Sequence, residues 1–596
     1  MRQFEHFPNL TTMFFARAAE EGDRPFLRVK RDGDWSVQSW AAVARDVAAL
    51  AAGLRAQGVQ PGDRVMLVSE NRPEFCIADL AIMAAGAVTV PTYTTNTTGD
   101  HAHIITDSGA SAVIFSTAKI AAALLPAVLR SSIRLAIAME PHRALQGGDV
   151  TLLDWDRIIA DHPADVAATA AAQTAQRGDL ACIIYTSGTG GAPRGVMQHH
   201  GAILCNVEGA QAIIAEDFGW EVDERFLSFL PISHSYEHSA GQFLPIGLGA
   251  EIWYAESLEK LAANISEARP TIMVVVPRLF EMLRVRITKA IEKEGGIGVR
   301  LLHIALAQGE RIARTGRRGW QDGPLDFLLN HTLRPKIQAR FGGRLKALVS
   351  GGAPLNPEVG RFFQALGLTL LQGYGQTEAA PVVSCNRPGA GIRMDSVGPP
   401  LRNVEIRIAG DGEILVRGEL VMHGYWRNDA ETARVLQDGW LHTGDIGEID
   451  DGGRLRITDR KKDLIVNDKG DNVAPQRVEG MLTLQPEIGQ AMVHGDRRPH
   501  LVALLVPDPD HARDWAIAHG LPEDAPLHDN AAFVATLRAA VDRVNAGLSI
   551  IERVRRIALA DEPFGIENGE MTPSLKIRRH VIRARYQARL DGLYGG

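Results

Sequence analysis

The sequence predicts an α/β protein. Its large N-terminal domain is expected to contain two α/β sheets plus a small barrel-like unit, and a smaller α+β C-terminal domain follows. Helical segments alternate with short β-branched runs along the first 350 residues, which is typical of parallel sheets. After Gly391 the segments become short, alternating and punctuated by glycine, which favours an antiparallel or barrel-like unit.

The expected elements of the N-terminal half follow one another at short intervals. Residues 40–54 carry apolar side chains at helical spacing, and the Gly- and Pro-containing turn at 58–63 ends that helix. A strand over 64–70, a helix over 75–85 and a strand over 87–91 come next. The same pattern predicts later strands within residues 181–187, 271–277 and 345–354, and a helix from about His200.

Two later regions depart from this alternation. Residues 284–341 are mostly helical and rich in arginine and lysine, and they are interpreted as a solvated helical insertion. The polar turn at 450–453 is the clearest boundary signal. The N-terminal domain is therefore predicted to span 1–451 and the C-terminal domain 452–596.

Composition excludes several classes of protein. The 596 residues are 45% hydrophobic and carry a net charge of −7, which argues against disorder and against a nucleic-acid binder. The cysteines lie far apart without a CxxC pair, so no disulfide framework or zinc ribbon is predicted. No secretory h-region and no uncharged apolar run of about 18 residues is present. We expect a cytoplasmic protein that can also associate peripherally with the inner face of the membrane.

Residues 185–196, YTSGTGGAPRGV, are the most informative stretch. Glycines let a backbone approach a ligand closely, and clustered hydroxyls and N–H groups suit phosphate oxygens. The stretch is not a P-loop, because Val196 stands where lysine is required, and Pro193 breaks the GxGxxG pattern. Taken alone, it predicts either a phosphate-binding turn or an ordinary glycine-rich turn.

Together with its other motifs, the sequence resembles the adenylate-forming (AMP-binding) superfamily, and within it the long-chain fatty acyl-CoA synthetases. The family's phosphate loop has the form YTSGTTGxPKGV. The other family motifs follow in the expected order: LPISHSYEH at 230–238, SGGAP at 350–354, GYGQTE at 373–378, LHTGD at 441–445, ITDRKKDLI at 457–465 and TPSLK at 572–576. Gly190 replaces the usual second threonine and Arg194 the usual lysine, which leaves open how tightly the loop grips ATP.

The resemblance implies a nucleotide site. Thr377 would contact the α-phosphate, and Glu378 would bind Mg²⁺, a hard cation that prefers oxygen ligands. Asp445 would accept hydrogen bonds from the ribose hydroxyls, and Arg460 would contact ribose or phosphate. The β- and γ-phosphates would be held by Thr186, Ser187, Gly188, Thr189 and Arg194. The adenine pocket would be lined by Gly352, Ala353, Pro354, Gly373 and Tyr374.

The resemblance also implies an acyl site and a moving domain. His234 would lie beside the acyl carboxylate, and Lys576 would bridge that carboxylate and the α-phosphate. After a rotation of the C-terminal domain, the segment around Gly470 would line the coenzyme A channel. The hinge candidates are Asp451, which we favour because two glycines follow it, and Asp459.

The function so implied is an ATP-dependent fatty acyl-CoA ligase. It would form acyl-AMP with release of pyrophosphate and then transfer the acyl group to the coenzyme A thiol. Long-chain fatty acids are favoured by the motifs at 230–238 and 472–479 and by the helical insertion. The expected substrates and cofactors are thus a fatty acid, ATP, Mg²⁺ and coenzyme A, with no nucleic acid; the oligomeric state stays open, a homodimer being one option.

Three alternatives are left open. The chain could be a fatty-acyl-AMP ligase that serves a carrier protein, although residues 460–479 show no insertion of the kind such enzymes carry. It could be a nucleotide-binding homologue with weak catalysis, because of the altered phosphate loop. His234–His238 also match the H-x-x-E-H pattern of zinc proteases, although Pro231 disfavours a helix there.

Overall fold

The computed structural model describes residues 5–142, 149–186, 193–221, 223–315, 319–320, 322–461, 464–469, 471–572 and 576–595. The chain forms two compact units. The first comprises Met1–Arg407, Leu415–Thr443 and Ile449–Arg456, and the second comprises Ile408–Ile414, Gly444–Glu448 and Ile457–Gly596. The predicted division at 451/452 stays a prediction.

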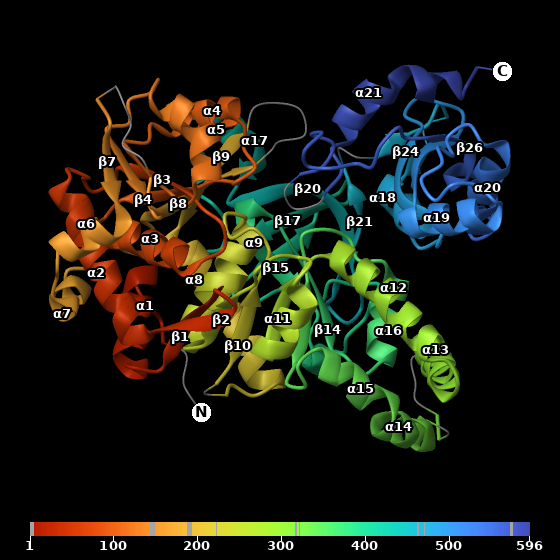
Figure 1. The fold of residues 1–596 in the computed structure, drawn as a ribbon, viewed down its shortest axis with the longest axis horizontal. Coiled ribbons are helices and arrows are strands. Elements are labelled where there is room, and N and C mark those ends of the chain that lie inside the picture. Colours follow the sequence, from red (N-terminus) through yellow and green to blue (C-terminus); the bar gives the residue numbers. More distant parts are fainter. Residues whose placement is uncertain are drawn as a thin grey trace. The chain divides into compact units, whose positions relative to one another are not determined.

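Two eight-stranded sheets form the framework of the first unit (Figure 1). In one sheet the central strands are parallel, and the last two, β9 and β18, are antiparallel to their neighbours. Its strand order is β18 (Gly424–Tyr425), β9 (Arg194–His199), β8 (Leu180–Thr186), β4 (Val88–Pro91), β3 (Arg64–Val68), β5 (Ala112–Phe115), β6 (Leu135–Ala138) and β7 (Thr151–Asp154).

The other sheet is also parallel in its middle, with an antiparallel strand at each edge. Its strand order is β15 (Val382–Cys385), β14 (Leu370–Gly375), β13 (Ala347–Ser350), β12 (Ile272–Val275), β10 (Arg225–Ser228), β11 (Glu251–Tyr254), β1 (Pro25–Arg31) and β2 (Asp34–Ser39). The strands expected within 64–70, 87–91, 181–187, 271–277 and 345–354 are thus confirmed as β3, β4, β8, β12 and β13.

One large apolar core joins the two sheets. It contains Val65 of β3, Ile184 of β8, Leu27 of β1 and Ile252 of β11 together with helix residues. Helix α3 (Pro73–Ala84) is buried along its whole length, which is why its sequence is apolar on all sides. The other helices of this layered region are α1 (Leu10–Glu21), α2 (Trp40–Ala56), α4 (Thr98–Ser108), α5 (Ala118–Val128), α6 (Trp155–Asp161), α7 (Val166–Ala171), α8 (His200–Asp217), α10 (Leu244–Leu248), α11 (Leu261–Ala268) and α16 (Pro357–Ala365).

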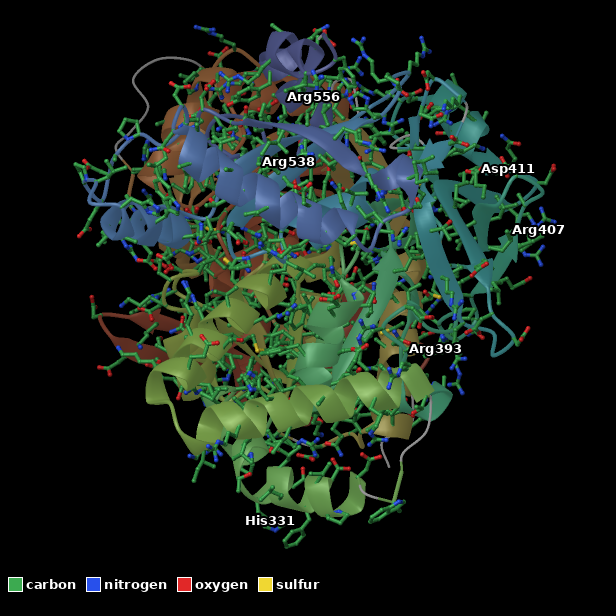
Figure 2. The ribbon with its side chains drawn as sticks, turned by 90° about the vertical axis from the view of Figure 1, so that its right-hand side faces the viewer. His331, Arg393, Arg407, Asp411, Arg538 and Arg556 are labelled. Carbon is green, nitrogen blue, oxygen red and sulfur yellow. The ribbon has the colours of Figure 1, made fainter. Side chains whose placement is uncertain are left out.

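The region expected to be a helical insertion is helical. It contains α12 (Pro277–Glu294), α13 (Ile297–Thr315), α14 (Asp322–His331) and α15 (Leu333–Arg340). Figure 1 shows α13 and α14 beyond α16, and Figure 2 shows His331 at the end of α14 with its side chain pointing outward. Several apolar side chains of this region are exposed, Trp320 by 91%. The predicted solvated character therefore applies to much of this insertion.

A five-stranded sheet carries the division between the units. Its order is β16 (Glu405–Ile408), β17 (Glu413–Arg417), β20 (Trp440–Ile449) and β19 (Leu436–Gln437), with β21 (Leu455–Arg460) against β20. The cuts between the two units fall within β16, β17, β20 and β21. The short strands of this sheet agree with the prediction from the glycine-punctuated sequence after Gly391.

The second unit has its own sheet and core. Strands β24 (Ile488–His494) and β25 (Leu501–Pro507) are antiparallel, and β26 (Val554–Leu559) runs parallel to β25. The helices are α18 (Pro475–Leu482), α19 (Pro509–Ala518), α20 (Ala531–Asn545) and α21 (Arg579–Gly592), and β22 (Ile465–Val466) pairs with β23 (Asn472–Val473). Apolar clusters cover both faces of the sheet. The predicted class, a large α/β part with a smaller α+β part, is confirmed.

Candidate active site

Three of the sequence motifs lie along one edge of the sheet that contains β10, β12, β13 and β14. Strands β10, β12, β13 and β14 are parallel neighbours, so their carboxyl ends share an edge. Residues 229–238 follow β10, residues 351–354 follow β13, and Thr377–Ala379 follow β14 as the 3₁₀ turn η2. Ligands of open α/β sheets bind outside the carboxyl ends of strands. The edge is therefore the natural place for the candidate site.

The residues predicted to line the adenine pocket sit at two neighbouring strand ends. Gly352 has a φ of +82°, a conformation that favours glycine, directly after β13. Gly373 and Tyr374 lie in β14, opposite Cys385 and Ser384 of β15. Ala353 and Pro354 continue the turn after Gly352. The structure thus brings the five predicted residues to adjacent strand ends, and their contact with adenine stays a prediction.

Thr377, the predicted α-phosphate ligand, is held from two sides. Its hydroxyl lies 3.0 Å from the hydroxyl of Ser235, and its carbonyl accepts a 2.7 Å hydrogen bond from Nε2 of Gln198. Ser235 comes from α9 (Ser235–Glu237), and Gln198 comes from β9 of the other sheet. Thr377 is 8% exposed, so little of it is free to reorient. Its position therefore depends on both sheets.

Glu378, the predicted Mg²⁺ ligand, is tied to the glycine-rich segment through an aromatic residue. The Tyr425 hydroxyl donates a 2.7 Å hydrogen bond to Glu378 Oε1, and burial together with Glu378 raises the pKa of Tyr425. The guanidinium of Arg194 lies 4.6 Å from the centre of the Tyr425 ring and forms an ion pair with Glu431. One cluster thus contains the predicted metal ligand and the predicted phosphate cation.

The two strands that bracket the phosphate loop are in register. Thr186 at the end of β8 pairs with Arg194 at the start of β9, and the amide of Trp426 donates to the carbonyl of Gly195 at 2.7 Å. The predicted phosphate ligands Ser187, Gly188 and Thr189, and the substituted Gly190, lie outside the described residues. The structure therefore fixes the two ends of the loop.

Glu431, which pairs with Arg194, also holds Arg434. Hydrogen bonds from Arg434 and then Arg194 lower the pKa of Glu431 to about 2, against the opposing effect of burial. Glu431 stands in the first turn of α17 (Asp429–Val435), where its amide is bonded to the cap residue Asn428. A carboxylate that stays ionised therefore faces the loop's cation throughout the physiological pH range.

His234, predicted to lie beside the acyl carboxylate, caps α9. Its Nδ1 accepts a 3.1 Å hydrogen bond from the amide of Tyr236. After α9 the chain forms a π-helix, η1 (His238–Phe243), a rare element that often marks functional sites. Glu237 is 1% exposed, and burial raises its pKa to about 8.

The two histidines of the H-x-x-E-H pattern have different surroundings. His238 is fully buried, and its Nε2 lies 2.9 Å from Oδ2 of Asp79 on α3. The same oxygen accepts a 2.7 Å hydrogen bond from Nε2 of Gln242. His234 caps a helix instead. Within the described ranges, no group of three or more His, Cys, Asp or Glu side chains is placed to hold a metal ion.

The residues predicted to contact ribose lie together in the second unit. Arg460 Nε at the end of β21 is 3.2 Å from Oδ1 of Asp445 on β20, and Asp445 is 4% exposed. Glu413 supports the same strand, because its Oε1 accepts the amide of Gly444 at 2.8 Å. Lys461 Nζ lies 3.2 Å from Oε2 of Glu413. The Asp445 carboxylate, a hydrogen-bond acceptor, and the Arg460 guanidinium, a cation, thus lie side by side.

Lys576, the predicted catalytic lysine, belongs to the second unit. Its amide donates to the hydroxyl of Thr572 at 3.1 Å, and its carbonyl accepts the amide of Thr572 at 2.8 Å. Met571 and Ile577 form an isolated antiparallel β-bridge. Gly470, predicted for the coenzyme A channel, lies outside the described residues. The hinge candidates Asp451 and Asp459 fall in the first and second unit respectively.

Sequence reasoning missed the residues that support the site from distant parts of the chain. Tyr425, Glu431, Ser235 and Asp79 make the contacts described above, and none was singled out as a site residue. Ser235 lies inside a recognised motif, so its polarity beside His234 was a usable signal. Tyr425 and Asp79 are separated from their partners by 47 and 159 residues, and one sequence carries no signal of such pairs.

Comparison with known proteins agrees with this geometry. Residues 14–426 match the family model "AMP-binding enzyme", and residues 462–596 match "AMP-binding enzyme C-terminal domain". The chain belongs to the AMP-binding enzyme family. The predicted resemblance to adenylate-forming enzymes is therefore confirmed.

Individual relatives align over nearly the whole chain. It is 32% identical to the long-chain-fatty-acid–CoA ligase FadD15 of Mycobacterium tuberculosis, over 98% of this chain and 97% of that protein. It is 31% identical to the peroxisomal long chain acyl-CoA synthetase 7 of Arabidopsis thaliana, over 99% and 87% of the two chains. Among solved structures, the adenylation domain of a carboxylate reductase from Mycobacterium chelonae aligns with a TM-score of 0.76 at 22% identity, covering 99% and 92%. The similarity to the carboxylate reductase domain shows a shared fold only.

Proposed function

We propose that this protein is an ATP-dependent fatty acyl-CoA ligase that activates long-chain fatty acids. It would form an acyl-AMP with release of pyrophosphate and then pass the acyl group to the thiol of coenzyme A. The single observation that carries the proposal is the 32% identity to a long-chain-fatty-acid–CoA ligase along 98% of the chain. The clustering of Thr377, Glu378 and Arg194 within one unit supports it.

The chemistry assigns a role to each group. A carboxylate must approach an α-phosphate, so positive charge and N–H donors have to offset two anions in the transition state. Arg194 and Lys576 would supply cations, and Thr377 would orient the α-phosphate. Asp445 and Arg460 would hold the ribose. Since the coenzyme A thiol is the nucleophile of the second step, the protein needs no catalytic cysteine, and all four of its cysteines are buried.

The residues around Glu378 fit a magnesium ion. Mg²⁺ in nucleotide sites takes one or two carboxylates and completes its shell with phosphate oxygens and water. Glu378 offers a half-buried carboxylate of which Oε1 accepts a hydrogen bond from Tyr425. When bound, the ion would offset the charge of the departing pyrophosphate. The protein's own part is to orient that carboxylate through Tyr425.

The decisive experiment measures pyrophosphate release with palmitate, in the presence and absence of coenzyme A. A ligase of the proposed kind releases pyrophosphate on addition of ATP and palmitate and produces palmitoyl-CoA when coenzyme A is present. Adenylate formation without acyl-CoA would favour the ligase that serves a carrier protein. No pyrophosphate release by a protein that binds ATP would favour the nucleotide-binding homologue.

We also propose that the second unit serves the two half-reactions in two orientations. Lys576 is needed during adenylation, whereas the pantetheine arm must later reach the same carbonyl carbon, so one face cannot do both. The hinge would be Asp451 or Asp459. The Lys576→Ala variant is expected to lose most acyl-AMP formation but still to convert supplied acyl-AMP to acyl-CoA. Asp451→Pro, which fixes φ near −65°, is expected to form acyl-AMP but to fail in the transfer of the acyl group to coenzyme A. Equal slowing of both half-reactions in folded Lys576→Ala would contradict this account.

A peripheral membrane contact through the helical insertion is a further part of the proposal. Trp320 is 91% exposed, Phe327 68% and Leu328 41%, although large apolar side chains are normally buried. Arginine and lysine outnumber aspartate and glutamate in residues 277–341, although the whole chain carries a charge of −7. Exposed aromatic residues near basic ones suit an anionic lipid surface. None of the helices in the described parts of the chain has the length and hydropathy that crossing a bilayer requires.

Vesicle co-sedimentation tests this contact. The protein is expected to sediment with vesicles that contain phosphatidylglycerol and to stay in solution with phosphatidylcholine alone. The double variant Trp320→Gln, Phe327→Gln should lose the binding, whereas Ile550→Gln, which removes a 72% exposed side chain of the second unit, should not. Equal binding by all three proteins would refute the contact. Gel filtration of the same samples would determine the oligomeric state, for which a homodimer is one option.

A further inference from the structure

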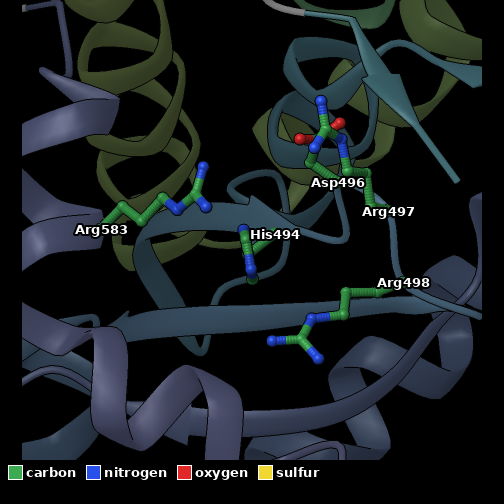
Figure 3. A pocket seen from close by; sticks show the side chains of 5 residues that line it. All are labelled: His494, Asp496, Arg497, Arg498 and Arg583. Atoms are coloured by element: carbon green, nitrogen blue, oxygen red, sulfur yellow. The ribbon is translucent and has the colours of Figure 1, made fainter.

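A basic pocket lies on the second unit, and none of its lining residues is among those predicted to bind ATP or the acyl chain. Its volume is about 450 Å³, and it is lined by His494, Asp496, Arg497, Arg498 and Arg583. Figure 3 shows His494 between the guanidinium groups of Arg583 and Arg498, with Arg497 and Asp496 on the neighbouring loop. The motifs of the adenylate-forming family account for none of these five residues.

The pocket is built by a tight turn and a helix. Strand β24 ends at His494, and the chain turns back to begin β25 at Leu501. The turn is held by the amide of Arg497, which donates to the carbonyl of Val466 at 2.8 Å, and by the amide of Arg498, which donates to Gly495 at 3.0 Å. Arg497 itself has a φ of +55°, which is uncommon for a residue with a side chain. Helix α21 supplies Arg583.

His494 is the buried polar group of the pocket. It is 8% exposed, so most of its ring is shielded from solvent. The edge of its ring meets Tyr594 at a centroid distance of 6.2 Å, and the Tyr594 hydroxyl donates to the His494 carbonyl at 3.0 Å. Burial lowers the pKa of His494, and Arg583 and Arg498 lower it further against Asp591 and Asp496. The ring is therefore a neutral donor and acceptor.

The charges around His494 favour an anion. Arg498 is paired with Asp591 at 2.5 Å and lies 4.9 Å from the centre of the Tyr594 ring, which fixes its direction. Arg497 and Arg583 add two further guanidinium groups to the lining. The only carboxylate among the lining residues is Asp496, whose Oδ1 accepts the amide of Val466 at 3.4 Å.

We propose that this pocket binds the phosphate group of a small phosphate ester. Guanidinium groups match phosphate oxygens in bidentate geometry, and a neutral imidazole can donate one further hydrogen bond. The volume falls within the range of small-molecule sites and exceeds what a lone phosphate fills, so it leaves room for the group that carries the phosphate. Two sources share this chemistry: a free phosphorylated metabolite, and the 3′-phosphate of coenzyme A. The second source rests on the proposed function.

Binding is tested on the full-length protein without turnover. Calorimetric titrations use inorganic phosphate, glycerol 3-phosphate and adenosine 3′,5′-bisphosphate, which is the nucleotide end of coenzyme A. In parallel, the His494 NMR signal of histidine-labelled protein is assigned by His494→Gln and followed through pH. A phosphate at the site should raise the midpoint of the His494 titration, because the anion offsets the effect of Arg583 and Arg498.

The variants separate the pocket from other sites. The double variant Arg497→Gln, Arg583→Gln is expected to weaken binding at least tenfold and to remove the shift of the His494 signal. Arg513→Gln, which removes an exposed arginine of α19 paired with Asp510, is expected to change neither. Binding by all three ligands would indicate a general phosphate site, and binding by the bisphosphate alone would indicate coenzyme A.

The proposal is overturned if no ligand moves the His494 signal, or if the double variant binds as tightly as the unchanged protein. Its failure can be told from failure of the ligase proposal, because pyrophosphate release without coenzyme A measures adenylation alone. A protein that binds phosphate but releases no pyrophosphate would retain this site and lose the ligase. A protein that adenylates palmitate but binds none of the three ligands would retain the ligase activity and lose this site.

Discussion

The hydroxyl of Tyr425 in β18 donates a 2.7 Å hydrogen bond to Oε1 of Glu378, which lies in the 3₁₀ turn η2 that follows β14 of the other sheet. The ring of Tyr425 also lies 4.6 Å beneath the guanidinium of Arg194. One aromatic side chain thus fixes both the predicted metal ligand and the predicted phosphate cation. A movement at the end of the glycine-rich segment would therefore change the position of the Glu378 carboxylate. This link can be tested.

Tyr425→Phe is expected to lower kcat for pyrophosphate release about threefold to tenfold and to raise the Mg²⁺ concentration needed for half-maximal activity. The phenyl ring remains beneath Arg194, whereas Glu378 loses a donor that orients its carboxylate. The measurement is a magnesium titration of the rate at saturating ATP and palmitate. Arg434→Gln serves as control, because it removes a different contact of the same cluster, at Glu431. An unchanged magnesium requirement would show that Tyr425 does not position the carboxylate.

Glu378→Gln is expected to reduce kcat by at least tenfold, which corresponds to about 1.4 kcal/mol of transition-state stabilisation, while circular dichroism and the melting temperature stay unchanged. The amide keeps the shape of the side chain but removes the negative charge that Mg²⁺ requires. Steady-state kinetics with varied ATP and Mg²⁺ provide the measurement. A kcat within about threefold of the unchanged protein would mean that Glu378 is not the metal ligand.

Ser235→Ala is expected to lower kcat about tenfold with a smaller change in the KM for ATP. The Ser235 hydroxyl lies 3.0 Å from that of Thr377, so its loss frees the Thr377 hydroxyl to turn away from the α-phosphate. Ser239→Ala is the matched control, since Ser239 bonds the Ala380 carbonyl at the same distance of 3.0 Å and contacts no predicted ligand. If both variants behave alike, the effect is one of packing and the role of Ser235 fails.

Glu237 predicts a dependence of stability on pH. Burial raises its pKa from 4.5 to about 8, so the folded protein binds a proton that the unfolded chain has already released. The contribution of Glu237 to folding stability should therefore fall as pH rises from about 4.5 to about 8 and stay constant outside that window. Glu237→Gln removes this contribution, so its melting temperature relative to the unchanged protein should rise between pH 5 and pH 8. A difference that does not vary with pH would show that Glu237 titrates normally.

The order of elements and most motif-bearing loops could be predicted from the sequence, because both depend on neighbouring residues. The alternation along residues 40–91 gave α2, β3, α3 and β4 nearly at their observed bounds. The run before the glycine-rich stretch predicted β8, since β-branched runs and glycine punctuation act locally, whereas β9 after the stretch was not predicted. Which strands become neighbours was beyond reach. Nothing near Gly424 indicates that it pairs with Met197 of β9.

By itself, the sequence determined the family and the α/β class, since these depend on residue types at fixed local spacing, and it supplied a set of site residues whose roles stay predictions. Tertiary structure alone decided that Tyr425 reaches Glu378, that Asp79 meets His238 and that Arg583 faces His494 across a pocket. The physical reason is that such contacts arise where separate elements pack. Burial then sets the pKa of Glu237 and the exposure of Trp320 from the surroundings and not from the local sequence.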